Sequence, residues 1–182
     1  MRDDGLPYAW LRAIDRITDF FGELAKWALL AAVLISSGNA AVRYVLGQSS
    51  NAWLEVQWYL FAAGVMFGAA QVLRLNEHVR VDVFYGSWKS RRQVLLDLFG
   101  LVFFLLPFVG LMAVLSWPML TQWVASGETS PNAGGLVRWP AMLALPLGFG
   151  LLVLQGVAEI TKRILWLRGR LRMDTHYEKP LQ

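Results

Sequence analysis

Long apolar stretches alternate with short polar stretches along almost the whole chain. No Asp, Glu, Lys or Arg occurs in residues 56–73, 98–127 and 139–158. A shorter apolar run, residues 27–42, includes two serines and an asparagine. About 20 apolar residues in a helix suffice to cross the hydrocarbon core of a bilayer. The pattern therefore predicts an all-α integral membrane protein with four transmembrane helices. We place these helices near residues 20–46, 52–74, 94–118 and 138–166.

The basic residues between these helices predict the orientation of the chain. They are frequent before the first helix, between the second and third, and after the fourth, whereas Arg43 and Arg138 alone accompany the other two connections. Because cytoplasmic segments carry the excess of Lys and Arg, both termini are predicted to be cytoplasmic. The net charge of +4 then reflects topology and contact with anionic lipids rather than binding to nucleic acid. The prediction is a single membrane domain, residues 1–182, with a cytoplasmic connection at 75–93, a periplasmic loop at 119–137 and a basic cytoplasmic tail at 167–182.

Two amphipathic segments flank the predicted helices on the cytoplasmic side. In the first, apolar residues recur every three or four positions, at Trp10, Ile14, Ile17, Phe21 and Leu24. This period predicts a helix that either lies on the membrane surface or extends the first span.

The second amphipathic segment has a strand-like pattern. His78, Arg80 and Asp82 alternate with three valines, yet a lone strand cannot satisfy its backbone in lipid. We therefore expect this segment at the cytoplasmic interface, either as a loop lying on lipid or as a surface that fixes the fold or docks a partner. Contact with lipid headgroups is predicted for the residues that follow, Trp88, Lys89, Arg91 and Arg92.

The residues that carry most enzyme chemistry are missing from the predicted spans. The sequence contains no cysteine, which excludes disulfides and thiolate metal sites. Both histidines, His78 and His176, fall outside the spans, so a haem held by two histidines within the membrane is not expected. We predict no catalytic site, no metal and no cofactor in this chain.

Two carboxylates stand at the cytoplasmic ends of predicted spans. Asp97 and Glu159 lie near Arg92 and Lys162 in the sequence, and we expect them to be solvated or salt-bridged rather than to form a proton relay. No lysine is expected to be buried.

The second predicted span carries an acid at its outer end and two glycines further in. Glu55 lies at the level of Trp53 and Trp58, which are typical of a membrane interface. It could reach the aqueous interface, pair with a partner helix, or bind a proton or substrate. Gly64 and Gly68 form a GxxxG spacing, which allows two helices to approach closely.

Two segments together resemble a known family. The sequence EVQWYLF at 55–61, followed by HVRVDVFYGSW at 78–88, is similar to the paired signature of the small membrane subunit of TRAP (tripartite ATP-independent periplasmic) transporters. The resemblance marks as fold-signature or partner-interface residues Glu55, Trp58, Tyr59, Gly64, Gly68, His78, Arg80 and Asp82.

The resemblance also implies a function. The chain would be a static accessory subunit in the bacterial inner membrane, bound to a large multi-span permease that holds the substrate and sodium sites. A periplasmic solute-binding protein would deliver an organic acid for sodium-driven uptake. Two alternatives stay open: a membrane anchor of an enzyme complex, and a small exporter that acts alone through Glu55.

Overall fold

A computed structural model describes residues 8–48, 50–76 and 88–171, and its regular structure is helical. The elements are α1 (Ala9–Leu46), α2 (Asn51–Leu75), α4 (Ser90–Gly100), the π-helix η2 (Leu101–Leu105), α5 (Leu106–Ser126) and α6 (Trp139–Leu167). Helices α4, η2 and α5 follow one another without a break, as Ser90–Ser126. The described residues thus contain four helices that are long and apolar enough to cross a membrane, which confirms the predicted number.

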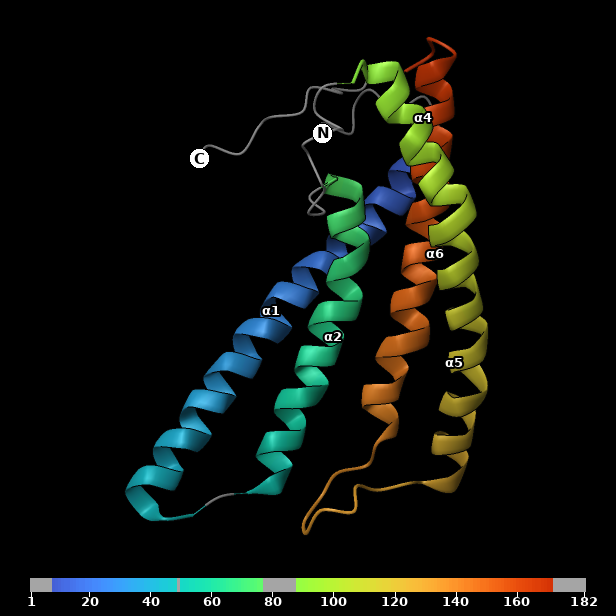
Figure 1. Cartoon of the computed structure of the whole chain (residues 1–182). Coiled ribbons are helices and arrows are strands. Elements are labelled where there is room, and N and C mark those ends of the chain that lie inside the picture. Colours follow the sequence, from blue (N-terminus) through green and yellow to red (C-terminus); the bar gives the residue numbers. More distant parts are fainter. Residues whose placement is uncertain (1–7, 49, 77–87, 172–182) are drawn as a thin grey trace.

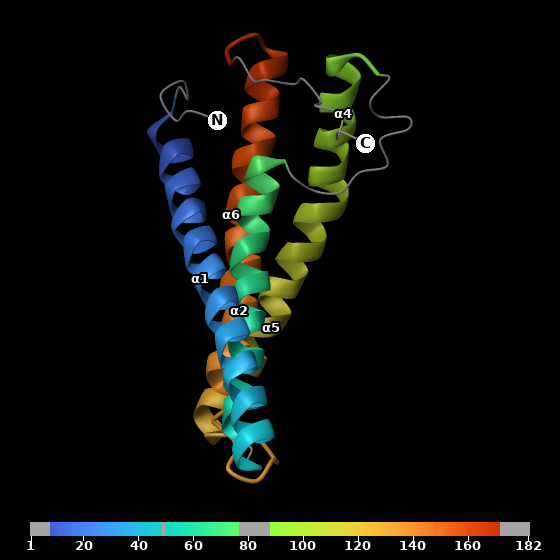
Figure 2. The same ribbon diagram turned by 90° about the vertical axis from the view of Figure 1, so that its left-hand side faces the viewer.

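The four long helices form a layer rather than a closed bundle. Helix α2 packs against both α1 and α6, and α5 packs against α6 on its other side. In Figure 1 the helices lie side by side in the order α1, α2, α6, α5. After a quarter turn their outer parts overlap in Figure 2, whereas the inner ends of α1, α6 and α4 diverge. We call the end where α1 begins and α6 ends the inner end, after the predicted cytoplasmic side, and the opposite end the outer end. At the inner end α1 also contacts α6.

The first amphipathic segment is part of a membrane-length helix. Helix α1 runs from Ala9 to Leu46 without interruption, so residues 10–24 extend the first span. The face of α1 that packs inside the protein is made of small and polar residues, together with one leucine: Leu11, Asp15, Thr18, Gly22, Ala25, Ala28 and Ala32. The large side chains of Trp10, Ile17 and Leu24 point outward and are more than 40% exposed. This arrangement suits a lipid environment, where close packing of small residues joins helices.

Glycines allow the helices of the layer to approach closely. A Cβ atom on Gly64 would lie 2.6 Å from Leu29 Cγ, and one on Gly68 would lie 3.6 Å from Ala25 Cβ. The GxxxG spacing therefore joins α2 to α1 of the same chain. A Cβ atom on Gly148 of α6 would lie 2.6 Å from Met66 Cβ of α2.

The π-helix η2 lies directly before a proline. Pro107 lacks a backbone N–H, and its ring would clash with the carbonyl group of Phe103 in a regular α-helix. A π-helical segment, Leu101–Leu105, occupies this position. The sequence predicts a kink at Pro107. In the structure, the distortion before this proline is the π-helix η2.

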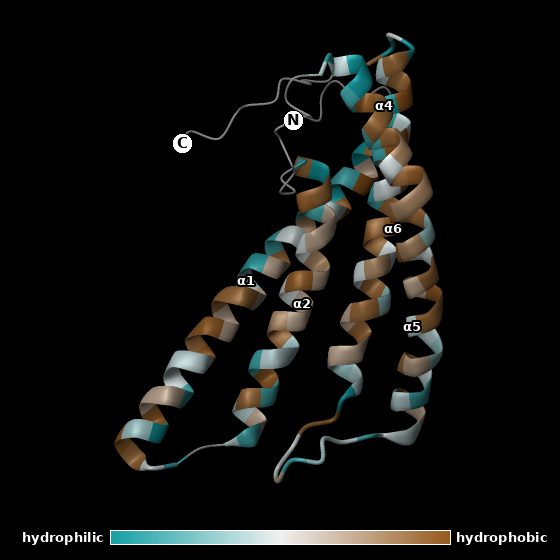
Figure 3. Ribbon diagram, viewed as in Figure 1, coloured by the Kyte–Doolittle hydropathy of each residue, from teal (hydrophilic) through white to brown (hydrophobic). Residues whose placement is uncertain are grey.

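Polar residues gather at the two ends of the layer. Figure 3 shows hydrophilic residues near the inner ends of the helices and in the outer connections, with hydrophobic residues between them. Candidate sites are therefore found at the two ends.

Candidate functional sites at the two ends of the helices

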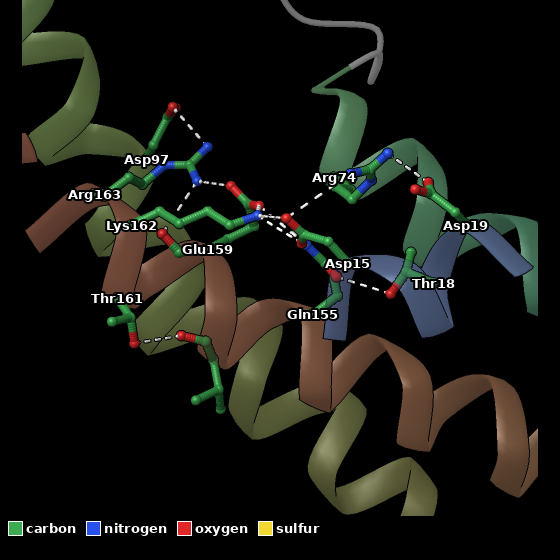
Figure 4. A network of polar contacts seen from close by, with 11 residues as sticks. Asp15, Thr18, Asp19, Arg74, Asp97, Gln155, Glu159, Thr161, Lys162 and Arg163 are labelled. Atoms are coloured by element: carbon green, nitrogen blue, oxygen red, sulfur yellow. Dashed lines mark hydrogen bonds and ion pairs between the residues drawn. The ribbon is translucent and has the colours of Figure 1, made fainter. Parts of the chain in front are cut away.

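An ionic network ties four helices together at the inner end, as Figure 4 shows. Its members are Asp15, Thr18 and Asp19 of α1, Arg74 of α2, Asp97 of α4, and Gln155, Glu159, Lys162 and Arg163 of α6. Helical spacing explains the contribution of α6, because residues three and four positions apart share one face.

Lys162 is the centre of the network. Its Nζ lies 2.7 Å from Asp15 Oδ1, 2.9 Å from Asp15 Oδ2 and 2.9 Å from Glu159 Oε1. The residue is 1% exposed, and Asp15 and Glu159 are 2% and 4% exposed. A buried ammonium group is tolerated when it is both paired and hydrogen-bonded, as it is here.

Neutral side chains complete the hydrogen bonds of the carboxylates. Gln155 Nε2 donates to Asp15 Oδ1 and to Glu159 Oε1, each at 3.1 Å. Thr18 Oγ1 donates to Gln155 Oε1 at 2.8 Å. The amide of Gln155, which is fully buried, therefore links α1 to α6.

Two arginines extend the network to the neighbouring helices. Arg163 Nη1 donates to Glu159 Oε2 at 2.5 Å, and Arg163 Nη2 lies 3.4 Å from Asp97 Oδ2 on α4. Arg74 Nη2 of α2 lies 2.5 Å from Asp19 Oδ1 of α1. The network thus fixes the relative positions of α1, α2, α4 and α6.

The structure corrects one expectation at this end and confirms another. Lys162 is buried, although no buried lysine was expected, because its charge is matched by carboxylates on α1 and α6. Asp97 is salt-bridged as expected, and its partner is Arg163 of α6. Glu159 is salt-bridged as expected, but it is buried inside the protein rather than solvated.

A second site, at the outer end, holds the loop between α5 and α6. The carboxylate of Glu55 accepts hydrogen bonds from Asn132 Nδ2 at 2.8 Å and from the backbone N–H of Leu136 at 2.7 Å. Tyr59 Oη donates to the carbonyl of Val137, and Asn51 Nδ2 donates to the carbonyl of Ala133, both at 3.1 Å. We call Asn51, Glu55 and Tyr59 the outer clamp.

The loop held by the outer clamp is itself ordered. Thr129 and Val137 form an isolated antiparallel bridge at its base. Arg138 Nη1 lies 2.7 Å from Glu128 Oε1, and its guanidinium carbon lies 4.4 Å from the centre of the Trp123 ring. The loop is therefore braced both by its own residues and by α2.

Glu55 consequently has an arrangement that the sequence did not predict. It is 2% exposed, and each of its oxygens accepts a hydrogen bond from the loop of the same chain. Trp58, its neighbour on α2, is 58% exposed and lines a groove of about 640 Å³ beside the loop.

The remaining predicted residues divide into two groups. His78, Arg80 and Asp82 lie outside the described residues, as does His176. The predicted headgroup contacts at the start of α4, namely Trp88, Lys89, Arg91 and Arg92, are all exposed. Within the described ranges, no group of three His, Cys, Asp or Glu side chains is placed to hold a metal ion.

Comparisons with known proteins give one match. The model of the family described as "Tripartite ATP-independent periplasmic transporters, DctQ component" matches residues 32–165, which is more than half of the chain. No curated protein and no solved structure matches. The matched residues include all of α2, α4, η2 and α5 and almost all of α6.

Proposed function

The chain belongs to the DctQ component family of the tripartite ATP-independent periplasmic (TRAP) transporters, and from this premise we propose that it is the fixed scaffold subunit of such a transporter. A large permease would carry the substrate and sodium sites. A periplasmic solute-binding protein would deliver an organic acid, and the complex would lie in the bacterial inner membrane.

The main support for the scaffold role is that the buried ion pairs join helices of this chain to one another. Lys162 binds carboxylates of α1 and α6, and Arg163 binds carboxylates of α4 and α6. Buried charged side chains that already pair with each other are poor sites for a transported ion. Releasing one of them to bind the ion would leave its partner unpaired inside the protein.

The apolar middle of the layer supports the same role. No charged residue occurs between Glu55 and Arg74 on α2, or between Arg138 and Glu159 on α6. Ion and proton pathways in membranes are marked by intramembrane ionisable residues. The outer clamp and the inner network are thus separate, and the hydrogen bonds that both oxygens of Glu55 accept favour a structural role over the proton site of the exporter alternative.

Reconstitution tests the proposal. Proteoliposomes that contain this chain, the large permease and the binding protein should take up an organic acid under an inward sodium gradient. Proteoliposomes that contain this chain alone should take up none. Sodium-driven uptake by the chain alone would contradict the scaffold role.

The orientation is tested separately, by reporter fusions. Fusions at Gln48 and Gly127 should report a periplasmic position and a fusion at Lys89 a cytoplasmic one, since basic residues favour the cytoplasmic side. A cytoplasmic signal at Gly127 would refute the predicted topology.

A further inference from the structure

A groove runs along the inner half of the layer between α2 and the continuous helix α4–η2–α5. It has a volume of about 650 Å³. Its lining is almost entirely apolar and includes Leu73, Gly100, Leu101, Phe104 and Phe108, with Asp97 and Arg163 as its charged residues. Asp97 and Arg163 also belong to the ionic network, but the apolar lining has no role in either the network or the outer clamp.

The groove is open at the junction between the α-helix α4 and the π-helix η2. Gly100 directly precedes η2, and a Cβ atom added there would meet nothing within 4 Å. The rings of Phe104 and Phe108 are 66% and 58% exposed. Because π-helical segments in α-helices are frequently found at functional sites, the coincidence of η2 with this groove favours a bound ligand.

The polar and apolar parts of the groove follow one another in a fixed order. Arg92, Leu96 and Gly100 are spaced four residues apart and share a face of α4. Arg92 is exposed one helical turn before Leu96, Asp97 and Arg163 line the groove together with Leu96, and apolar side chains line the rest. A phospholipid has the same order of parts, from a charged headgroup to hydrocarbon.

The length of the groove fits one leaflet. The residues of the continuous helix that line the groove run from Leu96 to Val109, over which the helix rises about 20 Å. Half of a bilayer with its headgroups is about 20 to 23 Å thick.

Charge favours an anionic headgroup. Lys89, Arg91 and Arg92 precede the groove on α4, and Arg168 and Arg170 follow α6 at the same end of the molecule, all of them exposed. Each basic residue near a membrane surface strengthens the attraction of anionic lipid.

We propose that this groove is a binding site for one anionic phospholipid, with its headgroup at Arg92 and an acyl chain along Phe104 and Phe108. The proposal requires that α4–η2–α5 spans a bilayer, and it does not depend on the transport function. A helix of a partner protein would match the apolar wall but not the basic mouth.

Native mass spectrometry of the full-length chain tests the site, after extraction from vesicles of equal parts phosphatidylglycerol and phosphatidylcholine. The wild-type chain should retain one phosphatidylglycerol in preference to phosphatidylcholine. Gly100→Leu should lower the retained lipid at least about fivefold, because the new side chain fills the groove. Gly110→Leu is the matched control, since Gly110 also has open space at its Cβ position but does not line the groove.

A second variant addresses the headgroup. Arg92→Gln, at an exposed position where folding is not at risk, should lower the preference for phosphatidylglycerol about fivefold. Equal retention of the two lipids by the wild type, or unchanged retention in Gly100→Leu, would overturn the proposal. Unchanged lipid in Gly100→Leu together with loss of co-purifying large permease would identify the groove as a protein interface instead.

Discussion

Replacing Lys162 with methionine should destabilise the protein strongly. Methionine keeps most of the side-chain volume but removes the ammonium group that lies within 2.9 Å of three carboxylate oxygens. Removing one partner of a buried ion pair costs about 3 to 5 kcal/mol. Glu159 keeps Arg163, and Asp15 keeps Gln155 and Arg74, whose Nη1 lies 3.8 Å from Asp15 Oδ2. We therefore expect a loss near the lower end, about 3 kcal/mol.

Thermal unfolding in a mild detergent, followed by tryptophan fluorescence, measures this loss. For a protein of this size 1 kcal/mol corresponds to about 2–4 °C, so Tm should fall by about 6–12 °C. The matched control is Lys26→Met. Lys26 also pairs with an acid three residues away, Glu23, but the two side chains are 63% and 58% exposed. An exposed pair contributes about 0–1 kcal/mol, so Tm should change by no more than about 4 °C.

A double variant separates pairing from packing. Asp15→Asn with Lys162→Met removes both charges, so its loss of stability should be smaller than the sum of the two single losses by about 0.5–3 kcal/mol. If the losses add, or if Lys162→Met unfolds no earlier than Lys26→Met, the network does not stabilise the helix contacts and the reasoning fails.

Two further predictions concern the outer clamp and the packing of α2. Glu55→Gln should speed amide hydrogen exchange in the loop 127–138, because one hydrogen-bond acceptor is lost, and should leave the sodium dependence of uptake unchanged; altered sodium coupling would show that Glu55 is an ion site. Gly148→Leu should lower Tm, because its Cβ atom would lie 2.6 Å from Met66 Cβ, whereas Gly150→Leu, with nothing within 4 Å, should not; equal thermal shifts in the two variants would contradict the close approach of α2 and α6.

The number of helices could be predicted because the thickness of the hydrocarbon core sets a minimum apolar length. Hydropathy alone places the start of the first span near residue 20, and the apolar period of residues 10–24 left open whether that segment lies on the membrane or extends the span. Hydropathy treats Asp15 and Asp19 as groups that need water, so it places the span after them. In the structure these acids bind Lys162 and Arg74, residues that are remote in the sequence, and the helix continues through them.

A signal for the buried network was present in the small residues of α1. Gly22, Ala25, Ala28 and Ala32 mark the face that packs against other helices. Extending this face by two turns towards the N-terminus reaches Thr18 and then Asp15. Charge counting for topology treats every lysine near a helix end as a surface group, and for that reason it missed the burial of Lys162.

The partners of Glu55 had no comparable signal. Asn132 and Leu136 lie in a turn-rich loop about 80 residues later, and loop residues follow no period that would show which side chain they approach. The acid itself could be recognised as unusual, because a carboxylate just inside a span needs a partner. Which partner it has depends on how the loop folds back onto α2.

The distance in sequence between the two halves of the inner network affects how the protein is made. Asp15 and Lys162 are 147 residues apart. At a synthesis rate of about 5–20 residues per second, the ribosome needs about 7–30 s to reach Lys162 after it has added Asp15. During that interval Asp15 lacks Lys162 and has only Arg74 of α2 as a basic neighbour, so we expect the first part of α1 to stay in contact with water until α6 has been made. The last helix to be made thus completes the burial of the first.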